Sequence, residues 1–377
     1  MANILDYLRW RGDLPFRQVP PGEVDALVLS YLSYMLYEGI VEEALPGEGV
    51  RLADAAAALL ARAERERNSM SYSIRDDARL LTLLRESERF GGVRLTGYVN
   101  RVDREAEKQF SAVTCLLEDG TALIAFRGTD DTLVAWKEDF YMGSMRTVPA
   151  QEEAAAYLCR AAWRYEQPLR VGGHSKGGNL SVYAAMSAPE EVQARLLDVY
   201  NNDGPGFRDS VGGTEGYRRI KERIHTILPQ YSLVGVLLKT DDDFEIVESC
   251  ETGISAHNGF TWQVKGRRFV RCADFPFRTR VFSEAMRGWT EDLSYDERRE
   301  LTDLFFGALE STGARTLTDL TAQKLRKAAA VTRELLSREE NRAMLADKFE
   351  LLLREYIASA KKELPRGRMR VKRGRDR

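Results

Sequence analysis

The residues best suited to chemistry form a glycine-rich segment, Gly173-His174-Ser175-Lys176-Gly177. The segment has the spacing G-x-S-x-G, and we expect a strand over residues 169–173 before it and a helix over residues 176–187 after it. A serine in this setting lies on a tight turn with neighbouring glycines, and its hydroxyl reaches the carboxyl edge of a sheet. The alternative is a strand-to-helix turn that is glycine-rich for packing alone. The context favours Ser175 as a nucleophile.

A nucleophilic serine needs a base, and the chain contains only three histidines. His174 is adjacent to Ser175 in the turn, so its side chain is expected to point away from the hydroxyl. His225 lies in an expected strand, residues 224–228, where a packed or edge position is the commoner case. His257 lies in an expected loop C-terminal to the serine, as the chain order of α/β-hydrolases requires. Taken alone it would be a solvent-exposed loop residue, but by elimination we predict His257 as the base.

The acid that would orient this histidine is less sharply defined. Asp203 follows an expected strand, residues 196–201, whose carboxyl end opens on the same edge as the serine. There it can accept the imidazole Nδ1–H and hold the useful tautomer, or it can simply begin the turn that the next glycine and proline complete. We predict Asp203 as the acid. Four rivals stay open, although a run of acids is usually a solvated turn: Asp241, Asp242, Asp243 and Glu245.

An oxyanion hole is expected at the exit of another strand, residues 121–126. Gly128 allows the backbone to turn sharply there, and the N–H and hydroxyl of Thr129 are predicted donors. The second predicted donor is the backbone N–H of Lys176, the residue after the nucleophile. Without the glycine-rich turn downstream, the same segment would be interpreted as a plain strand exit.

The elements that must hold these residues alternate along the chain. From residue 152 to residue 272, expected strands alternate with helices, which predicts an α/β fold with a mostly parallel central sheet. The expected elements before this region are helices over 22–66 and 76–89, strands over 93–100, 110–117 and 121–126, and a hairpin turn at 118–120. Later strands are expected at 244–249 and 262–272.

The last hundred residues are almost all helix-forming. Expected capping boxes pair Ser294 with Glu297 and Ser337 with Glu340. The predicted organisation is therefore an α/β-hydrolase core with an N-terminal helical cover over residues 1–278, a helical extension over 279–364 and a basic, disordered tail over 365–377.

Composition narrows the function classes. Of 377 residues 44% are apolar, and 56 basic residues balance 58 acidic ones, which argues against wholesale disorder and against a protein built mainly to hold nucleic acid. The four cysteines are scattered without a Cys or His cluster, so we expect no disulfide framework, metal or organic cofactor. The first residues lack the pattern of a secretory signal, and a cytoplasmic protein is expected.

The tail carries seven basic residues against one acidic residue over positions 366–377. Such a segment suits anionic lipid headgroups or nucleic acid, whereas the commoner case is a solvated terminus. Weak contact with an anionic membrane surface stays an alternative, and no specific nucleic-acid partner is expected.

In combination, these segments resemble the class 3 lipases, which are serine esterases of the α/β-hydrolase fold that act on acylglycerols. The resemblance is carried by Phe126-Arg127-Gly128-Thr129, by Trp136 with Asp139, and by residues 172–178. A closer resemblance, over about residues 4–310, is to a bacterial family of lipase-like α/β-hydrolases of unestablished substrate, common in Gram-positive species. Its features recur as Gln109-Phe110-Ser111-Ala112, Trp136-Lys137-Glu138-Asp139, Gly173 to Asn179, Asp203-Gly204-Pro205-Gly206-Phe207, and His257 with Trp262.

One position departs from the class 3 pattern. Those lipases carry the acid in an Asp-x-Val-like segment after the next strand, and the matching stretch here, residues 230–234, has Ser232 where aspartate is expected. Either Asp203 supplies the acid from the neighbouring strand, or the triad is incomplete.

Residues and resemblance together predict a serine hydrolase that cleaves carboxylic esters of small molecules or lipids through an acyl-enzyme. The predicted triad is Ser175, His257 and Asp203, with Thr129 and Lys176 as oxyanion donors. The alternatives are a hydrolase fold used as a binding or interaction module and a surface-associating protein that acts through its tail.

Overall fold

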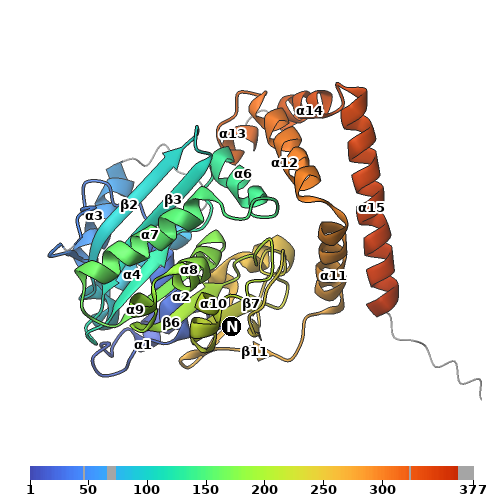
Figure 1. Ribbon diagram of the computed structural model, residues 1–377. Coiled ribbons are helices and arrows are strands. Elements are labelled where there is room, and N and C mark those ends of the chain that lie inside the picture. Colours follow the sequence, from blue (N-terminus) through green and yellow to red (C-terminus); the bar gives the residue numbers. More distant parts are fainter. Residues whose placement is uncertain (46, 66–73, 322–323, 364–377) are drawn as a thin grey trace, which may run out of the picture.

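A computed structural model describes residues 1–45, 47–65, 74–321 and 324–363 (Figure 1). Its centre is a nine-stranded sheet with the strand order β1-β2-β3-β4-β5-β6-β7-β8-β11. Strands β4 to β8 run parallel, whereas β1 to β3 and β11 pair antiparallel at the two sides. The strands are β1 Val50–Arg51, β2 Arg94–Asp103, β3 Lys108–Leu116, β4 Ala122–Phe126, β5 Leu169–His174, β6 Leu196–Asn202, β7 Ile224–Pro229, β8 Phe244–Val247 and β11 Arg271–Cys272, with a separate hairpin of β9 Val264–Lys265 and β10 Arg268–Phe269. The expected α/β fold with a mostly parallel central sheet is confirmed.

Two hydrophobic cores cover the two faces of the sheet. One packs α1 to α5 against it, and the other packs α7 and α8 against the opposite face. Strands β4 and β5 are buried at every position. The continuous apolar sequence of β4 is typical of such a strand, whereas β5 also buries Arg170 and His174. The helices of these layers are α1 Ile4–Arg11, α2 Glu23–Leu32, α3 Leu52–Arg65, α4 Ile74–Glu86, α5 Glu88–Gly91, α6 Leu133–Tyr141, α7 Pro149–Arg164, α8 Lys176–Ser187, α9 Glu190–Gln193 and α10 Glu215–Ile220, with 3₁₀ turns η1 Lys221–Arg223, η2 Gly253–His257 and η3 Gly259–Thr261.

In the described part of the chain, five further helices follow the sheet, and they form the right-hand side of Figure 1. They are α11 Phe277–Asp292, α12 Tyr295–Glu310, α13 Leu317–Thr321, α14 Lys324–Leu335 and α15 Glu339–Glu363. Helix α12 packs on α6 through Leu133, Phe306 and Leu309. The segment after α12 also joins the loop before α6 by backbone bonds, from Leu133 N to Arg315 O (3.0 Å) and from Leu317 N to Asp131 O (2.9 Å). The C-terminal helices therefore brace the segment that leaves β4.

Some local features predicted from the sequence are present in the structure, and others are not. The hairpin turn at residues 118–120 is present, with Gly120 at a φ of 81°. The capping box of Ser294 with Glu297 is present at the start of α12. The box of Ser337 with Glu340 was a wrong prediction: the Ser337 hydroxyl donates back to Glu334 O (2.8 Å), and α15 begins only at Glu339. The strand expected over 262–272 is broken into β9, β10 and β11, because Gly266 turns the chain at a φ of 62°. The basic tail lies outside the described residues.

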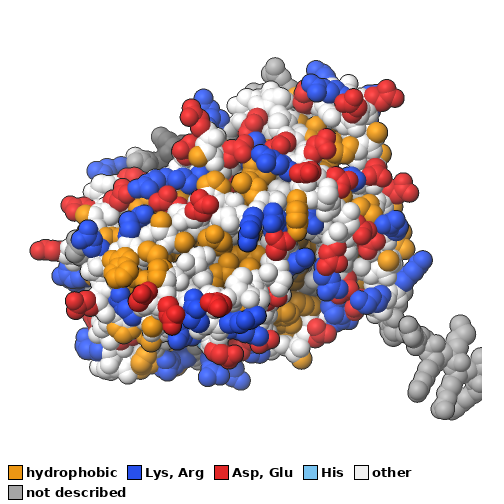
Figure 2. All heavy atoms as spheres, in the orientation of Figure 1, with side chains coloured by type: hydrophobic (Ala, Val, Ile, Leu, Met, Phe, Trp, Pro, Cys, Tyr) orange, Lys and Arg blue, Asp and Glu red, His pale blue; other side chains and the backbone are white. Residues whose placement is uncertain are grey.

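Basic and acidic side chains are interspersed over the face shown in Figure 2, as the balanced charge count leads one to expect. Apolar side chains gather in the middle of the same view, over the region between α6 and α8. Within the described ranges, no helix combines the length and the apolar character needed to cross a bilayer.

Candidate active site

Parallel strands bring four of the predicted segments to one edge of the sheet. Strands β4, β5, β6 and β7 are consecutive neighbours, and their carboxyl ends are Phe126, His174, Asn202 and Pro229. The segments that leave these strands carry Thr129, Ser175, Asp203 and Ser232. Ligands of open α/β sheets bind outside this edge, so the fold places the predicted residues where such sites occur.

Ser175 occupies the turn between β5 and α8 in a strained conformation. Its φ of 59° and ψ of −135° lie in a region that non-glycine residues rarely adopt, at a cost of about 1–3 kcal/mol. The neighbouring glycines are needed for space. A Cβ on Gly173 would lie 2.2 Å from the Gly177 backbone, and one on Gly177 would lie 2.1 Å from Phe126 O. Close packing of turn, helix and strand thus explains the glycine spacing around the serine.

His257 and Asp203, predicted from separate segments, form a hydrogen-bonded pair. His257 Nδ1 donates to Asp203 Oδ2 at 2.6 Å, and the Asp203 side chain is completely buried. The indole of fully buried Trp262 donates to Ala256 O (2.9 Å), which fixes the backbone next to the histidine. The carboxylate therefore sets the tautomer of His257, with Nε2 left as the basic nitrogen.

Ser232 supports the Asp203 carboxylate. Its hydroxyl donates to Asp203 Oδ1, and Gly235 N donates to the same oxygen at 3.1 Å. Asp203 itself has a φ of 52°, which turns its side chain out of the strand direction toward these partners. The position where class 3 lipases carry aspartate thus holds a donor to the neighbouring acid. The departure from the class 3 pattern favours Asp203 over an incomplete triad.

Three of the rival acids have partners elsewhere. Asp241 accepts from Ser210 Oγ and from two backbone N–H groups, and Asp242 accepts from Tyr217 and Thr226. Glu245 pairs with Arg271. None of these contacts involves His257.

The two remaining histidines differ in environment. His225 lies on β7, its side chain is 43% exposed, and it pairs with Asp198 at 2.9 Å. His174 is buried, its ring centroid lies 4.5 Å from that of His257, and burial lowers its pKa to about 3. Because a carbonyl only accepts, neutral His174 carries its proton on Nε2 and donates to His257 O at 2.7 Å. His174 therefore ties the His257 loop to the serine turn.

The segment after β4 passes directly beside the serine. A Cβ on Gly128 would lie 2.7 Å from His174 O and 3.0 Å from Ser175 Cβ, so only glycine fits. The Thr129 hydroxyl donates to the Asp139 carboxylate and is committed to that contact, which leaves the backbone N–H as its candidate oxyanion donor. The N–H of Lys176, the first residue of α8, is one of the groups that a helix leaves without an intrahelical partner.

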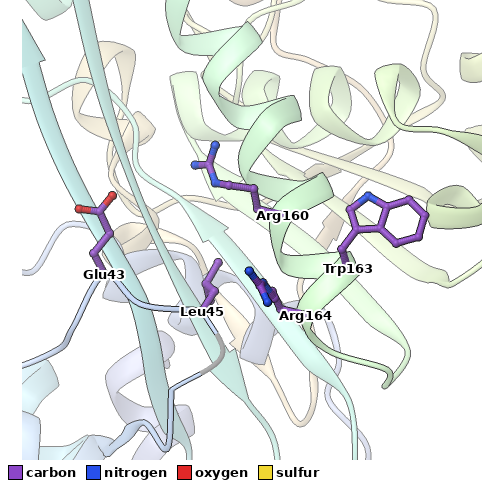
Figure 3. A pocket seen from close by; sticks show the side chains of 5 residues that line it. All are labelled: Glu43, Leu45, Arg160, Trp163 and Arg164. Carbon is purple, nitrogen blue, oxygen red and sulfur yellow. The ribbon is translucent and has the colours of Figure 1, made fainter.

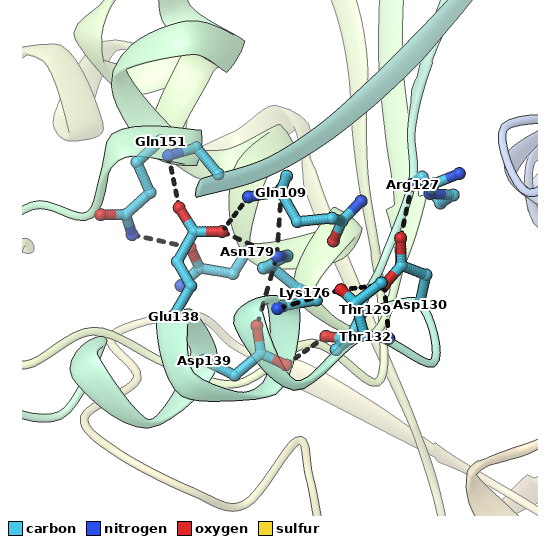
Figure 4. A network of polar contacts seen from close by, with 12 residues as sticks. Gln109, Arg127, Thr129, Asp130, Thr132, Glu138, Asp139, Gln151, Lys176 and Asn179 are labelled. Carbon is cyan, nitrogen blue, oxygen red and sulfur yellow. Dashed lines mark hydrogen bonds and ion pairs between the residues drawn. The ribbon is translucent and has the colours of Figure 1, made fainter. Parts of the chain in front are cut away.

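Behind this edge, the Lys176 side chain enters a network of buried charges (Figure 4). Its completely buried ammonium lies 3.0 Å from Glu138 Oε2, 3.2 Å from Gln109 O and 3.5 Å from Asp139 Oδ1. Glu138 also accepts from the backbone N–H groups of Gln109 (3.0 Å) and Ala150 (2.8 Å). Burial raises the pKa of Asp139 to about 6, against the lowering influence of Lys176. The network joins β3, α6 and α8 under the serine turn.

The model of the Mbeg1-like family matches residues 84–307, more than half of the chain. The chain belongs to the Mbeg1-like family. Membership implies a lipase-like hydrolase fold, in agreement with the sheet and the serine turn, and the matched range contains every candidate site residue. No curated protein and no solved structure matches the chain.

Sequence reasoning did not predict the part played by the Lys176 side chain. Only the backbone of Lys176 was assigned a role, and Glu138 and Asp139 entered only through the family resemblance. A usable signal was present: a lysine at the start of an otherwise uncharged helix that is buried needs a counter-charge, and the adjacent acids Glu138 and Asp139 are candidates. The Ser175 hydroxyl, by contrast, makes no hydrogen bond to His257 or to any other residue in the described part of the chain.

A hollow of about 550 Å³ lies away from these residues (Figure 3). It is lined by Glu43, Leu45, Arg160, Trp163 and Arg164. Helix α7 ends there, next to the amino end of β5, and none of the lining residues is a candidate site residue. Figure 3 shows the Trp163 ring pointing away from the other side chains, and Glu43 and Arg160 already pair with Arg101 and Glu153. The side chains do not converge on a ligand position.

Potential metal ligands are not grouped near the site. Among residues 1–45, 47–65, 74–321 and 324–363, no cluster of three His, Cys, Asp or Glu side chains could hold a metal ion.

Proposed function

We propose that the protein is a serine hydrolase that cleaves carboxylic esters, including lipid esters, through an acyl-enzyme intermediate. The observation that carries the proposal is the His257–Asp203 pair on the same sheet edge as the strained Ser175 turn. The carboxylate holds the histidine so that its basic Nε2 is free, and the turn exposes the serine at the helix N-terminus.

In the proposed reaction, Ser175 Oγ attacks the ester carbonyl carbon while its proton moves to His257 Nε2. The resulting oxyanion accepts hydrogen bonds from the N–H groups of Lys176 and Thr129, and each such donor typically contributes a factor of about 10²–10³ to kcat. The C–O bond to the alcohol then breaks, and His257 returns the proton to the leaving oxygen. Water, deprotonated by His257, hydrolyses the acyl-enzyme and restores the serine.

Location and partners are part of this proposal. All four cysteines are free thiols, which suits a reducing compartment, and we propose that the enzyme acts in the cytoplasm. Its substrate would be a small-molecule or lipid ester, and contact of the basic tail with an anionic membrane surface stays a prediction.

A fluorophosphonate probe tests the nucleophile. Folded wild-type protein should become labelled, and Ser175→Ala should not. Ser187→Ala is the matched control, because Ser187 lies at the exposed far end of the same helix α8 and should not affect labelling. Absence of labelling on intact wild type would contradict the proposal and favour a binding role for the hydrolase fold.

A further inference from the structure

A second cavity, of about 570 Å³, lies beside the loops that hold the candidate triad. Its walls come from three segments: the loop after β7, the start of η2, and the first turn of α11. The lining residues are Tyr231, Leu233, Thr252, Gly253 and the run Pro276 to Thr279.

The same segments support the triad. Tyr231 and Leu233 flank Ser232, whose hydroxyl donates to Asp203. Gly253 is the first residue of η2, and His257 is its last. The Thr279 hydroxyl donates to Gln230 O (3.0 Å), which ties the first turn of α11 to the loop after β7. The segments that line the cavity are therefore the same segments that contact Asp203 and carry His257.

The chemistry of the walls is mostly apolar. Leu233 and Pro276 offer aliphatic surface, and the Phe277 ring is 41% exposed although it is a large hydrophobic side chain. Arg278 is the one charged lining residue, and within the described ranges it forms no ion pair. An apolar cavity of this size with a single charge suits an aliphatic chain, since each buried methylene is worth about a fourfold gain in affinity.

We propose that this cavity binds the unbranched alkyl chain of the ester substrate. The chain would lie between Leu233 and Phe277, with the ester group toward Ser175. The inference rests on the proposed function and adds the substrate class: esters with a long alkyl chain on either the acyl side or the alcohol side of the scissile bond.

Two series of ester substrates distinguish an alkyl chain on the acyl side of the scissile bond from one on the alcohol side. The first is p-nitrophenyl esters from acetate to myristate, and the second is alkyl butyrates of increasing alcohol length. Thr252→Trp would place a large ring in the cavity from an exposed position whose native side chain makes no capping bond. The ratio of kcat/KM for the longest to the shortest substrate should fall at least tenfold in one series, and that series identifies the bound chain. Phe277→Ala should lower the same ratio by removing the opposite wall.

Leu197→Trp is the matched control, because it adds the same ring at an exposed position near the amino end of β6, at the far edge of the sheet. Its ratio should equal that of wild type. Unchanged ratios in both series for both Thr252→Trp and Phe277→Ala, with melting temperatures like that of wild type, would overturn the inference.

A binding measurement separates this inference from the proposed function. Ser175→Ala protein should bind cis-parinaric acid, a fluorescent fatty acid, and adding Thr252→Trp should weaken that binding at least tenfold, whereas adding Leu197→Trp should not. If wild type hydrolyses no ester but this pattern holds, the proposed function fails and the cavity assignment stands. If esters are hydrolysed and Thr252→Trp changes neither binding nor chain preference, the cavity assignment fails alone.

Discussion

Two ion pairs are completely buried among the described residues, and they differ in how fully they are compensated. Arg89 and Asp25 join α5 to α2 in the N-terminal cover by two parallel hydrogen bonds of 2.8 Å. Arg89 also donates to the carbonyls of Leu14 and Val19, and Tyr7 donates to Asp25 at 2.8 Å. Both charged groups of this pair therefore have several hydrogen-bond partners.

The pair beneath the serine turn is less complete. The Lys176 ammonium is shared between Glu138 and Asp139, and its contact with Asp139 is the longer one, at 3.5 Å. Asp139 Oδ1 is buried without a hydrogen-bond partner in the described part of the chain, and burial raises the pKa of this carboxyl to about 6. The contacts of the first pair stay within the N-terminal cover, whereas Asp139 of the second accepts from the hydroxyl of Thr129, a predicted oxyanion donor. We therefore expect the second pair to couple the fold to the predicted oxyanion segment.

Of the two buried pairs, the one beneath the serine turn should respond more strongly, because replacing Lys176 should lower both stability and activity. Lys176→Met leaves the buried Glu138 and the partly buried Asp139 without their cation, which should lower the free energy of unfolding by about 3–5 kcal/mol. The Thr129 segment loses its anchor at the same time, so kcat/KM for p-nitrophenyl butyrate should fall about a hundredfold. Urea denaturation and steady-state kinetics measure the two effects. Adding Glu138→Gln, which removes one uncompensated charge, should recover part of the stability. Wild-type kinetics for the single variant would contradict the coupling.

Replacing Arg89 should cost a similar amount of stability without the kinetic effect. Arg89→Met leaves Asp25 buried and unpaired, and unfolding should become easier by about 3–5 kcal/mol. Since no contact of this pair reaches the serine edge, kcat/KM of the folded fraction should stay within about twofold of wild type. A large loss of kcat/KM at temperatures where the variant is fully folded would show that the two pairs are not functionally distinct.

Asp139 should give a pH dependence of its own. Its folded-state pKa of about 6 lies above its ordinary value of 3.8, so the folded protein binds the proton more tightly than the unfolded chain. The stability that this group provides is therefore complete below about pH 4 and is lost as pH rises through 6. Asp139→Asn removes that loss. The unfolding free energy of the variant minus that of wild type should rise with pH between 4 and 7 by about 3 kcal/mol. A pH-independent difference would show that folding does not raise the pKa of Asp139.

The glycine spacing explains why the serine turn could be predicted from sequence. Gly173 and Gly177 are fixed by steric contacts within a few residues or with the adjacent strand, so their pattern is visible along the chain. His257 was reached because few histidines exist, and Asp203 because a carboxylate after a parallel strand must reach the same edge. These inferences needed only local geometry and the order of the strands.

The contacts between distant segments could not be predicted in the same way. Ser232 was recognised only as a departure from a pattern, since nothing in the chain shows that its hydroxyl meets Asp203, 29 residues away. Helix α6 was not expected, because its burial comes partly from the C-terminal helix α12. The failed capping box at Ser337 follows from competition by the nearby carbonyl of Glu334, which local spacing does not reveal.

The smallest effect should come from His225, whose pairing with Asp198 is the exposed counterpart of the His257–Asp203 pair. His225 is 43% exposed, and Asp198 keeps a 2.8 Å contact with Arg170 when the histidine is replaced. His225→Gln should therefore change the unfolding free energy by less than about 1 kcal/mol and leave kcat/KM unchanged. His257→Gln is the matched comparison: it should lower kcat/KM by at least about a thousandfold, because it removes the partly buried imidazole that the buried Asp203 carboxylate orients. Equal activity losses in the two variants would mean that burial beside the serine turn does not distinguish the base.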